Sequence, residues 1–223
     1  MTATSRLMMF LVVSVVASSV TMSALARGSA EAGATVANTC LACHGANGNS
    51  VNAAWPSLAG QNAAYIEKQL KHFHDATRNG MEKDKTGMLM PPMAAALTPQ
   101  QIEDVAAYYS VQTPAGGEAN AAYWEAGRKL FHGGDRARGI PACAACHGPL
   151  GSGNPAAGYP QLRAQHSDYT IKQLNAYHSR TRYTVNAKGA SSGGDNAEIM
   201  HTIVDRLSAD DIRNLAAYVE GLR

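Results

Sequence analysis

Large aromatic side chains are scarce in this sequence of 223 residues, and its net charge is small. It contains three Phe and two Trp, so something other than aromatic side chains is expected to fill part of the core. Hydrophobic residues still make up 45% of the chain, which excludes an intrinsically disordered protein. The formal net charge is only +2. A nucleic-acid partner is therefore not expected, because phosphates require a clustered basic surface.

Long hydrophobic runs are also missing beyond the N-terminus. After a basic start at Arg6, an apolar stretch runs from Met8 to about Val20, which is short for a membrane span. Ala24-Leu25-Ala26 then supplies the small-x-small pattern of a signal cleavage site. We expect residues 1–26 to be a cleaved signal peptide and the mature protein to be exported to the periplasm and soluble. An uncleaved membrane anchor is the alternative.

Only four cysteines are present, and they form two tight pairs. In an exported chain, four cysteines would ordinarily predict two disulfides. Here each pair is followed by histidine, in Cys40-Leu-Ala-Cys43-His44 and Cys143-Ala-Ala-Cys146-His147, and C-x-x-C-H is typical of c-type haem attachment. On one helical turn the two thiols can add to the vinyl groups of one porphyrin, and the histidine is placed under the iron. We predict two covalently bound haem c groups; a thioredoxin-like pair and a zinc site are the alternatives.

The two motifs belong to an internal repeat. The haem motif recurs after 103 positions, and two further segments recur after 104 and 110 positions, so the offset grows only by small insertions. These further segments are Pro56–Gln61 with Pro160–Gln165 and Leu97–Tyr108 with Leu207–Tyr218. We infer a tandem duplication in which each copy owns one haem.

A Pro/Gly-rich stretch, Gln112–Glu118, separates the two copies and suits a linker. The length of the chain allows two domains of about a hundred residues each. We therefore expect a signal peptide at 1–26, an N-terminal domain at 27–113, a linker at 114–120 and a C-terminal domain at 121–223.

Each copy is predicted to be helical, which makes the fold class all-α. A capping box with proline at the first helical position begins a helix at Thr98, and Ser208 with Asp211 begins its counterpart in the second copy. Both helices have an apolar face at the 3.6-residue period. Further helices are expected at Asn62–Arg78, Ser167–Arg180 and Tyr123–Phe131, and Gly-rich loops at Gly45–Gly60 and Gly148–Gly158.

The sixth ligand of each iron determines its chemistry. A methionine lies seven residues before a paired leucine in both copies, at Met90 and Met200. Thioether ligation is typical of c-type cytochromes, although methionine is also a common gap-filler. Three rivals stay open: Met88, Met93 and His201. The remaining histidines are expected on the solvated surface: His72, His74, His166 and His178.

Over nearly its whole mature length, the chain resembles the cytochrome c4 family, whose members consist of two class I cytochrome c domains. The resemblance rests on C-A-A-C-H-G, on the two Pro-x-Leu-x-x-Gln segments and on Lys-Gln-Leu runs at Lys68–Leu70 and Lys172–Leu174. The start of the second copy, Gly127–Gly134 and Gly139–Cys143, is similar as well. One departure is Arg163-Ala164, where the first copy has Ala59-Gly60, the usual form of the family; it leaves the local loop geometry open.

The resemblance also implies ligand sets. It places the axial ligands at His44 with Met90 and at His147 with Met200, in agreement with the internal count. It further implies that a backbone carbonyl near Pro56 and near Pro160 orients each proximal imidazole.

The expected function is electron transport rather than catalysis. Iron held by histidine and methionine has no open position for a substrate, and thioether ligation raises its reduction potential. The resemblance implies a periplasmic carrier that receives electrons from a quinol-oxidising complex and delivers them to a terminal oxidase or reductase. Association with the membrane surface stays open. The alternatives are a haem subunit of an enzyme complex, such as a flavocytochrome dehydrogenase, and an enzyme or sensor with a five-coordinate haem.

Overall fold

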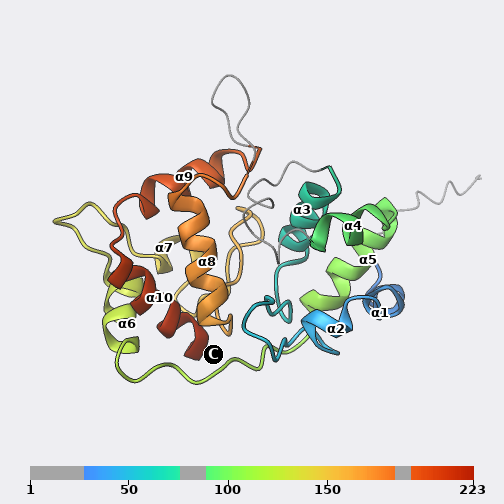
Figure 1. Ribbon diagram of the computed structural model, residues 1–223, viewed down its shortest axis with the longest axis horizontal. Coiled ribbons are helices and arrows are strands. Elements are labelled where there is room, and N and C mark those ends of the chain that lie inside the picture. The colour runs from blue at the N-terminus through green and yellow to red at the C-terminus, as the bar shows by residue number, and fades with distance from the viewer. Residues whose placement is uncertain (1–27, 76–88, 184–191) are drawn as a thin grey trace, which may run out of the picture.

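The computed structural model describes residues 28–75, 89–183 and 192–223, and the helices of these residues occur in two sets of five. The first set is α1 (Ala30–Ala37), α2 (Leu41–His44), α3 (Ala63–His74), α4 (Met90–Ala95) and α5 (Pro99–Ser110). The second is α6 (Trp124–Gly133), α7 (Ala144–His147), α8 (Ser167–His178), α9 (Asp195–Val204) and α10 (Ala209–Gly221). Figure 1 shows the sets as two bundles side by side. The all-α prediction with two tandem domains is confirmed.

The first and last helices of each bundle cross in close contact, α1 on α5 and α6 on α10. A glycine lies at each crossing. A Cβ atom on Gly33 would overlap the backbone of Asp104, and one on Gly127 would overlap the backbone of Asn214. The bundles therefore repeat the same backbone-to-backbone approach, which only glycine permits.

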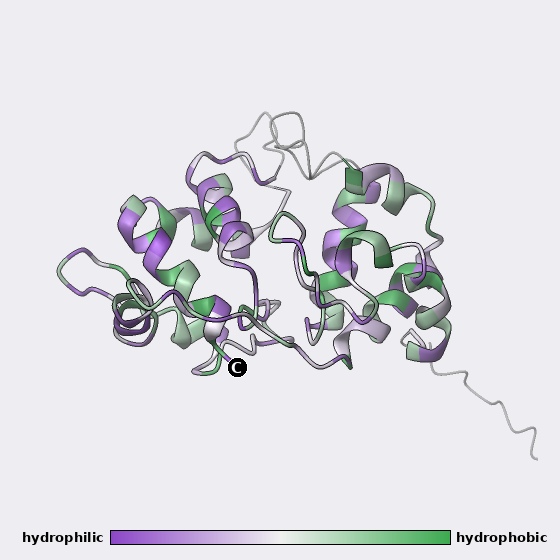
Figure 2. Cartoon of the chain, turned by 60° about the horizontal axis from the view of Figure 1, so that its bottom comes forward, coloured by the Kyte–Doolittle hydropathy of each residue, from purple (hydrophilic) through white to green (hydrophobic). Residues whose placement is uncertain are grey.

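Each bundle has its own small core. Figure 2 shows hydrophobic and hydrophilic residues banded along the helices, as expected of helices with one buried face. Alanine is the commonest of the buried hydrophobic residues in the described ranges, and Ala94, Ala106 and Ala216 are each at most 1% exposed. The larger buried side chains at the centres of the bundles include Tyr109 and Phe131. Such small residues leave room beside each core, in agreement with the scarcity of aromatic residues.

Both predicted capping boxes are present. The Thr98 hydroxyl accepts from the backbone N–H of Gln101, whose side chain accepts in return from the Thr98 N–H. Ser208 and Asp211 repeat the arrangement at the start of α10. Arg138 also donates to Asp211, and this bond is the main reason that the pKa of Asp211 falls to about 2.

Other element boundaries differ from the prediction. Helices α3 and α8 end at His74 and His178, four and two residues before the expected ends; in the second copy the chain turns at Arg180, where φ is 54°. Helices α1, α4 and α9 were not predicted. In α4 the two prolines lie in the first turn, where a missing N–H does no harm, so they do not break the helix.

No helix in the described ranges is long and apolar enough to span a membrane, and the predicted signal peptide lies outside those ranges.

The segment between the bundles is hydrogen-bonded to both of them. Asn49 of the first bundle donates to the Thr113 carbonyl, and the Gly117 N–H donates to the Glu220 carbonyl at the end of α10. The segment between the bundles, residues 112–120, forms no helix. Figure 1 shows this segment running along one edge of both bundles.

The glycine at the α6–α10 crossing provides a test of the packing. Gly127→Ala should lower the free energy of unfolding by about 1–3 kcal/mol, because its methyl group overlaps the Asn214 carbonyl. Gly133→Ala is the matched control, since a Cβ at that end of the same helix meets nothing within 4 Å. Chemical denaturation followed by circular dichroism measures both. Equal stability of the two variants would contradict the close crossing.

Candidate haem sites at the domain interface

The C-x-x-C-H motifs form the short helices α2 and α7. In each, the first cysteine, Cys40 or Cys143, precedes the first helical residue. All four thiols are free rather than disulfide-bonded, and the histidines His44 and His147 are buried, at 6% and 7% exposure. The local turn therefore presents two thiols and one imidazole together in both copies, as covalent attachment of a haem requires.

A backbone carbonyl fixes the orientation of each imidazole. Nδ1 of His44 lies 2.8 Å from the Pro56 carbonyl oxygen, and Nδ1 of His147 lies 2.9 Å from that of Pro160. Because a carbonyl can only accept, Nδ1 carries the proton, and Nε2 of the neutral ring keeps its lone pair for a metal. Burial lowers the pKa of both histidines below the ordinary value, which favours this neutral form. The carbonyl contacts implied by the family resemblance are present.

One cavity borders both motifs, and its walls are mostly apolar. The proximal histidines line it, and so do Met90 and Met200. Met93 lines it as well, so it stays a rival to Met90, while Met88 lies outside the described residues. The rival His201 is not among the residues that line the cavity, and its Nδ1 lies 2.6 Å from the Tyr177 carbonyl oxygen.

Two of the four histidines expected on the solvated surface lie between the domains instead. Nε2 of His166 is 2.8 Å from the Ser50 carbonyl oxygen, and the His72 ring lies 5.2 Å from that of Tyr183. The prediction was wrong for these two because a sequence repeat does not reveal which surfaces face each other. His74 and His178 are exposed, as predicted.

The buried polar atoms of the cavity suggest that it receives a polar group. Within the described residues, only three buried side-chain nitrogen and oxygen atoms have no hydrogen-bond partner: Tyr109 Oη, Arg182 Nε and Arg182 Nη1. Both residues line the cavity. An unpartnered buried polar atom costs roughly 1–3 kcal/mol, so partners are expected from a ligand. Paired thiols, neutral imidazoles, apolar walls and unpartnered donors together fit a haem that carries carboxylates.

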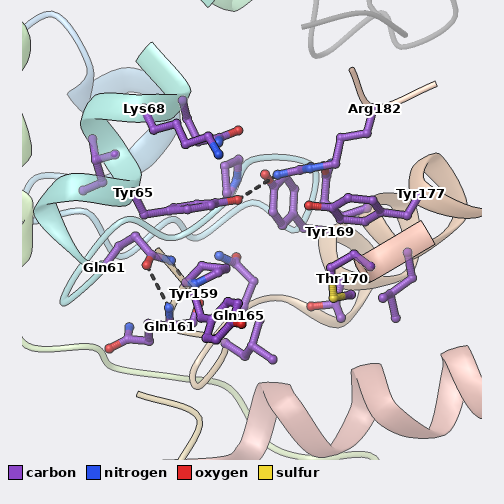
Figure 3. A pocket seen from close by; sticks show the side chains of 18 of the residues that line it. Gln61, Tyr65, Lys68, Tyr159, Gln161, Gln165, Tyr169, Thr170, Tyr177 and Arg182 are labelled. Carbon is purple, nitrogen blue, oxygen red and sulfur yellow. Dashed lines mark hydrogen bonds between the residues drawn. The ribbon is translucent and has the colours of Figure 1, made fainter. Parts of the chain in front are cut away.

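The Pro-x-Leu-x-x-Gln segments also join the two domains. The Gln61 side chain donates to the Gln161 carbonyl at 2.9 Å and accepts from its N–H at 2.8 Å. Gln165 makes the same two contacts, both at 2.9 Å, with the backbone of Ser57. Each motif glutamine thus holds the residue that follows the proline of the other copy (Figure 3 shows the Gln61–Gln161 contact). The sequence showed that these glutamines repeat but gave no sign of their partners.

The departure at Arg163-Ala164 leaves the loop unchanged. Gly60 and Ala164 both have a left-handed backbone, with φ of 69° and 60°. The N–H of each bonds to the last helix of its own domain, to Tyr109 and Val219 respectively. Glycine would be the easier residue at Ala164, but the conformation is retained.

Comparison with known proteins gives consistent matches over nearly the whole chain. The cytochrome c family model matches residues 30–110 and again 124–223. Cytochrome c4 of Stutzerimonas stutzeri is 40% identical over 210 residues, covering 91% of this chain and 93% of the relative. A thiosulfate dehydrogenase electron acceptor of Thiomonas intermedia is 34% identical, covering 82% and 78%.

Solved structures agree with these relatives. Reduced recombinant cytochrome c4 from Pseudomonas stutzeri superposes with a TM-score of 0.74 at 39% identity, covering 88% of this chain and all of that one. Cytochrome c4 of Acidithiobacillus ferrooxidans gives 0.70 at 31% identity, covering 83% and 99%. A thiosulfate dehydrogenase (TsdBA) from Marichromatium purpuratum gives 0.69 at 33% identity, covering 86% of this chain but only 40% of that one.

Removing one interface glutamine should loosen the domains without unfolding them. Gln165→Leu deletes both of its hydrogen bonds to Ser57 across the interface, together with a local one from the His166 N–H, and leaves the Ser57 backbone unpaired. Small-angle X-ray scattering should then show a larger radius of gyration, and proteases should cut the segment between the domains faster. Gln112→Leu is the control, because the side chain of that glutamine donates within the first domain, to the Tyr108 carbonyl. Identical scattering from the two variants would argue against the interface.

Proposed function

The chain belongs to the cytochrome c4 family of dihaem electron carriers, and from that premise we propose that it serves a respiratory chain in the periplasm. In this role it receives electrons from a quinol-oxidising complex and delivers them to a terminal oxidase or reductase. The observation that carries the proposal is the duplicated site itself: in each copy a buried, neutral imidazole and a methionine line the same cavity. Such a pair leaves iron closed to substrates and suited to outer-sphere electron transfer.

We propose that His44 with Met90 and His147 with Met200 would hold the irons of the two haems. A haem bound there would supply one-electron chemistry. The protein contributes the rest: the proline carbonyls fix the imidazole rings, the apolar walls exclude water, and thioether ligation raises the reduction potential relative to bis-histidine ligation.

Electron exchange with partners needs an accessible edge of the cavity in each domain. Met93 and Ile199 line the cavity and are nevertheless 43% and 40% exposed. Met93 lies three residues after Met90, and Ile199 directly precedes Met200. These apolar surface positions support brief docking of redox partners through small interfaces. We further propose that the chain is exported and that its signal peptide, residues 1–26, is removed. The mature protein then consists of domains at 27–113 and 121–223 joined by a linker at 114–120.

A second function is favoured by two of the relatives. The chain resembles a thiosulfate dehydrogenase electron acceptor and part of the thiosulfate dehydrogenase TsdBA. It would then be the electron-transfer subunit of a dehydrogenase rather than a free carrier. Stable co-purification with a catalytic subunit supports this function, whereas a monodisperse protein that is reduced by a quinol-oxidising complex supports the carrier.

The ferric absorption spectrum tests the carrier through its ligands. Both haems should be low-spin with a methionine charge-transfer band, and Met200→Ala should remove about half of that band. Met90→Ala should remove the other half. Met93→Leu is the control, since it changes a neighbouring methionine that also lines the cavity.

A full band in Met200→Ala or Met90→Ala would refute the assignment of that ligand. High-spin iron in the unmodified protein, together with binding of carbon monoxide or peroxide, would refute the carrier and indicate an enzyme or sensor.

A further inference from the structure

A buried arginine bridges the two domains at the cavity. Arg182 follows α8 in the C-terminal domain, is 4% exposed, and donates through Nη2 to the Tyr65 hydroxyl of α3 at 2.8 Å. Its guanidinium lies 5.0 Å from the ring centre of Tyr177 and 5.4 Å from that of Tyr183. Figure 3 shows it reaching across to Tyr65. No carboxylate is paired with it among the described residues.

Two donors of this arginine are left over. Nε and Nη1 are buried and have no hydrogen-bond partner within the described residues. Arginine stays charged in proteins, so it cannot escape burial by losing its proton. A buried charge is tolerated when it is paired, and truncating or removing its partner is strongly destabilising. The surrounding tyrosines supply ring faces and one hydroxyl acceptor, which is incomplete compensation for a full charge.

The charge of the cavity wall also favours an anionic ligand. Among the described residues, its lining includes three cationic side chains, Lys68, Lys172 and Arg182, and no aspartate or glutamate. Lys68 and Lys172 occupy equivalent positions of the two copies, and Lys68 also crosses the interface, donating to the Gly193 carbonyl at 2.9 Å. A mostly apolar cavity whose described lining holds three cations and no acid is complementary to a ligand that carries carboxylates.

We propose that Arg182, held by Tyr65, is the counter-ion of haem carboxylates at the domain interface and thereby raises the reduction potential of at least one haem. The proposal rests on the two haems of the carrier but not on its methionine ligands or its partners. Guanidinium nitrogens form charge-assisted hydrogen bonds with carboxylates, and Nε and Nη1 of Arg182 each keep a donor for a carboxylate oxygen. A fixed positive charge favours the state of the haem with one more electron, and the low dielectric of the interior strengthens this effect.

The position of Arg182 between the domains also links their docking to charge compensation. Its main-chain position belongs to one domain and its hydroxyl partner to the other, so docking of the domains and charge compensation depend on the same side chain. In the repeat, Arg182 corresponds to Arg78 at the offset of 104 that also relates Tyr65 to Tyr169. Arg78 lies outside the described residues.

A redox titration of the haem-loaded protein, followed by visible spectroscopy, tests the proposal. Arg182→Gln should lower the equilibrium constant for reduction of at least one haem by about tenfold, which is 59 mV for a one-electron couple. Arg182→Lys, which keeps the charge, should recover most of that shift. Arg180→Gln is the matched control: it removes the same charge two residues away, from a side chain that is 51% exposed and paired with Asp205.

Unchanged potentials in Arg182→Gln, or an equal shift in Arg180→Gln, would overturn the proposal. If Arg182→Gln does not retain both haems, haem content becomes the measurement: retention in Arg182→Lys supports a requirement for charge, and loss in both variants overturns it. The methionine charge-transfer band should persist in every variant that retains its haems. Its persistence with unchanged potentials would refute the counter-ion and leave the proposed carrier intact.

Discussion

The hydrogen bond from each proximal imidazole to a proline carbonyl is the interaction on which the rest of the structure depends. It places the proton on Nδ1 and reserves Nε2 for iron, so it decides what His44 and His147 can do. Burial of both rings supports the same neutral state by lowering their pKa. Without the carbonyls, the C-x-x-C-H turns would still present thiols, but the orientation of each imidazole would be undetermined.

The same loops that orient the imidazoles also dock the domains. The residue after each proline is held at both its N–H and its carbonyl by a glutamine of the other copy, Gln165 on one side and Gln61 on the other. A movement between the domains is therefore transmitted to a segment directly bonded to a proximal histidine. Arg182 adds a charged link across the same interface. Ligand geometry, domain docking and cavity charge thus form one connected unit.

The sequence predicted most features that depend on local spacing. The haem motifs and both capping boxes are local patterns, the duplication is their recurrence along the chain, and the structure and comparisons confirm them. The sequence did not predict features that depend on which surfaces of the two domains meet. The contacts of His166 and His72 across the interface were missed, as was the burial of Arg182 among tyrosines. Helix α4 was missed because Pro91 and Pro92 usually mark a helix end, whereas here they occupy its first turn.

The central claim is that each copy of the repeat owns one covalently bound haem. Intact-protein mass spectrometry of the exported protein, combined with haem staining of its two domains after cleavage between residues 112 and 120, tests this claim directly. The account predicts a mass equal to that of the processed chain plus two haems, with one haem on each domain fragment. A single haem, or a mass that indicates disulfides between Cys40 and Cys43 or between Cys143 and Cys146, would contradict it.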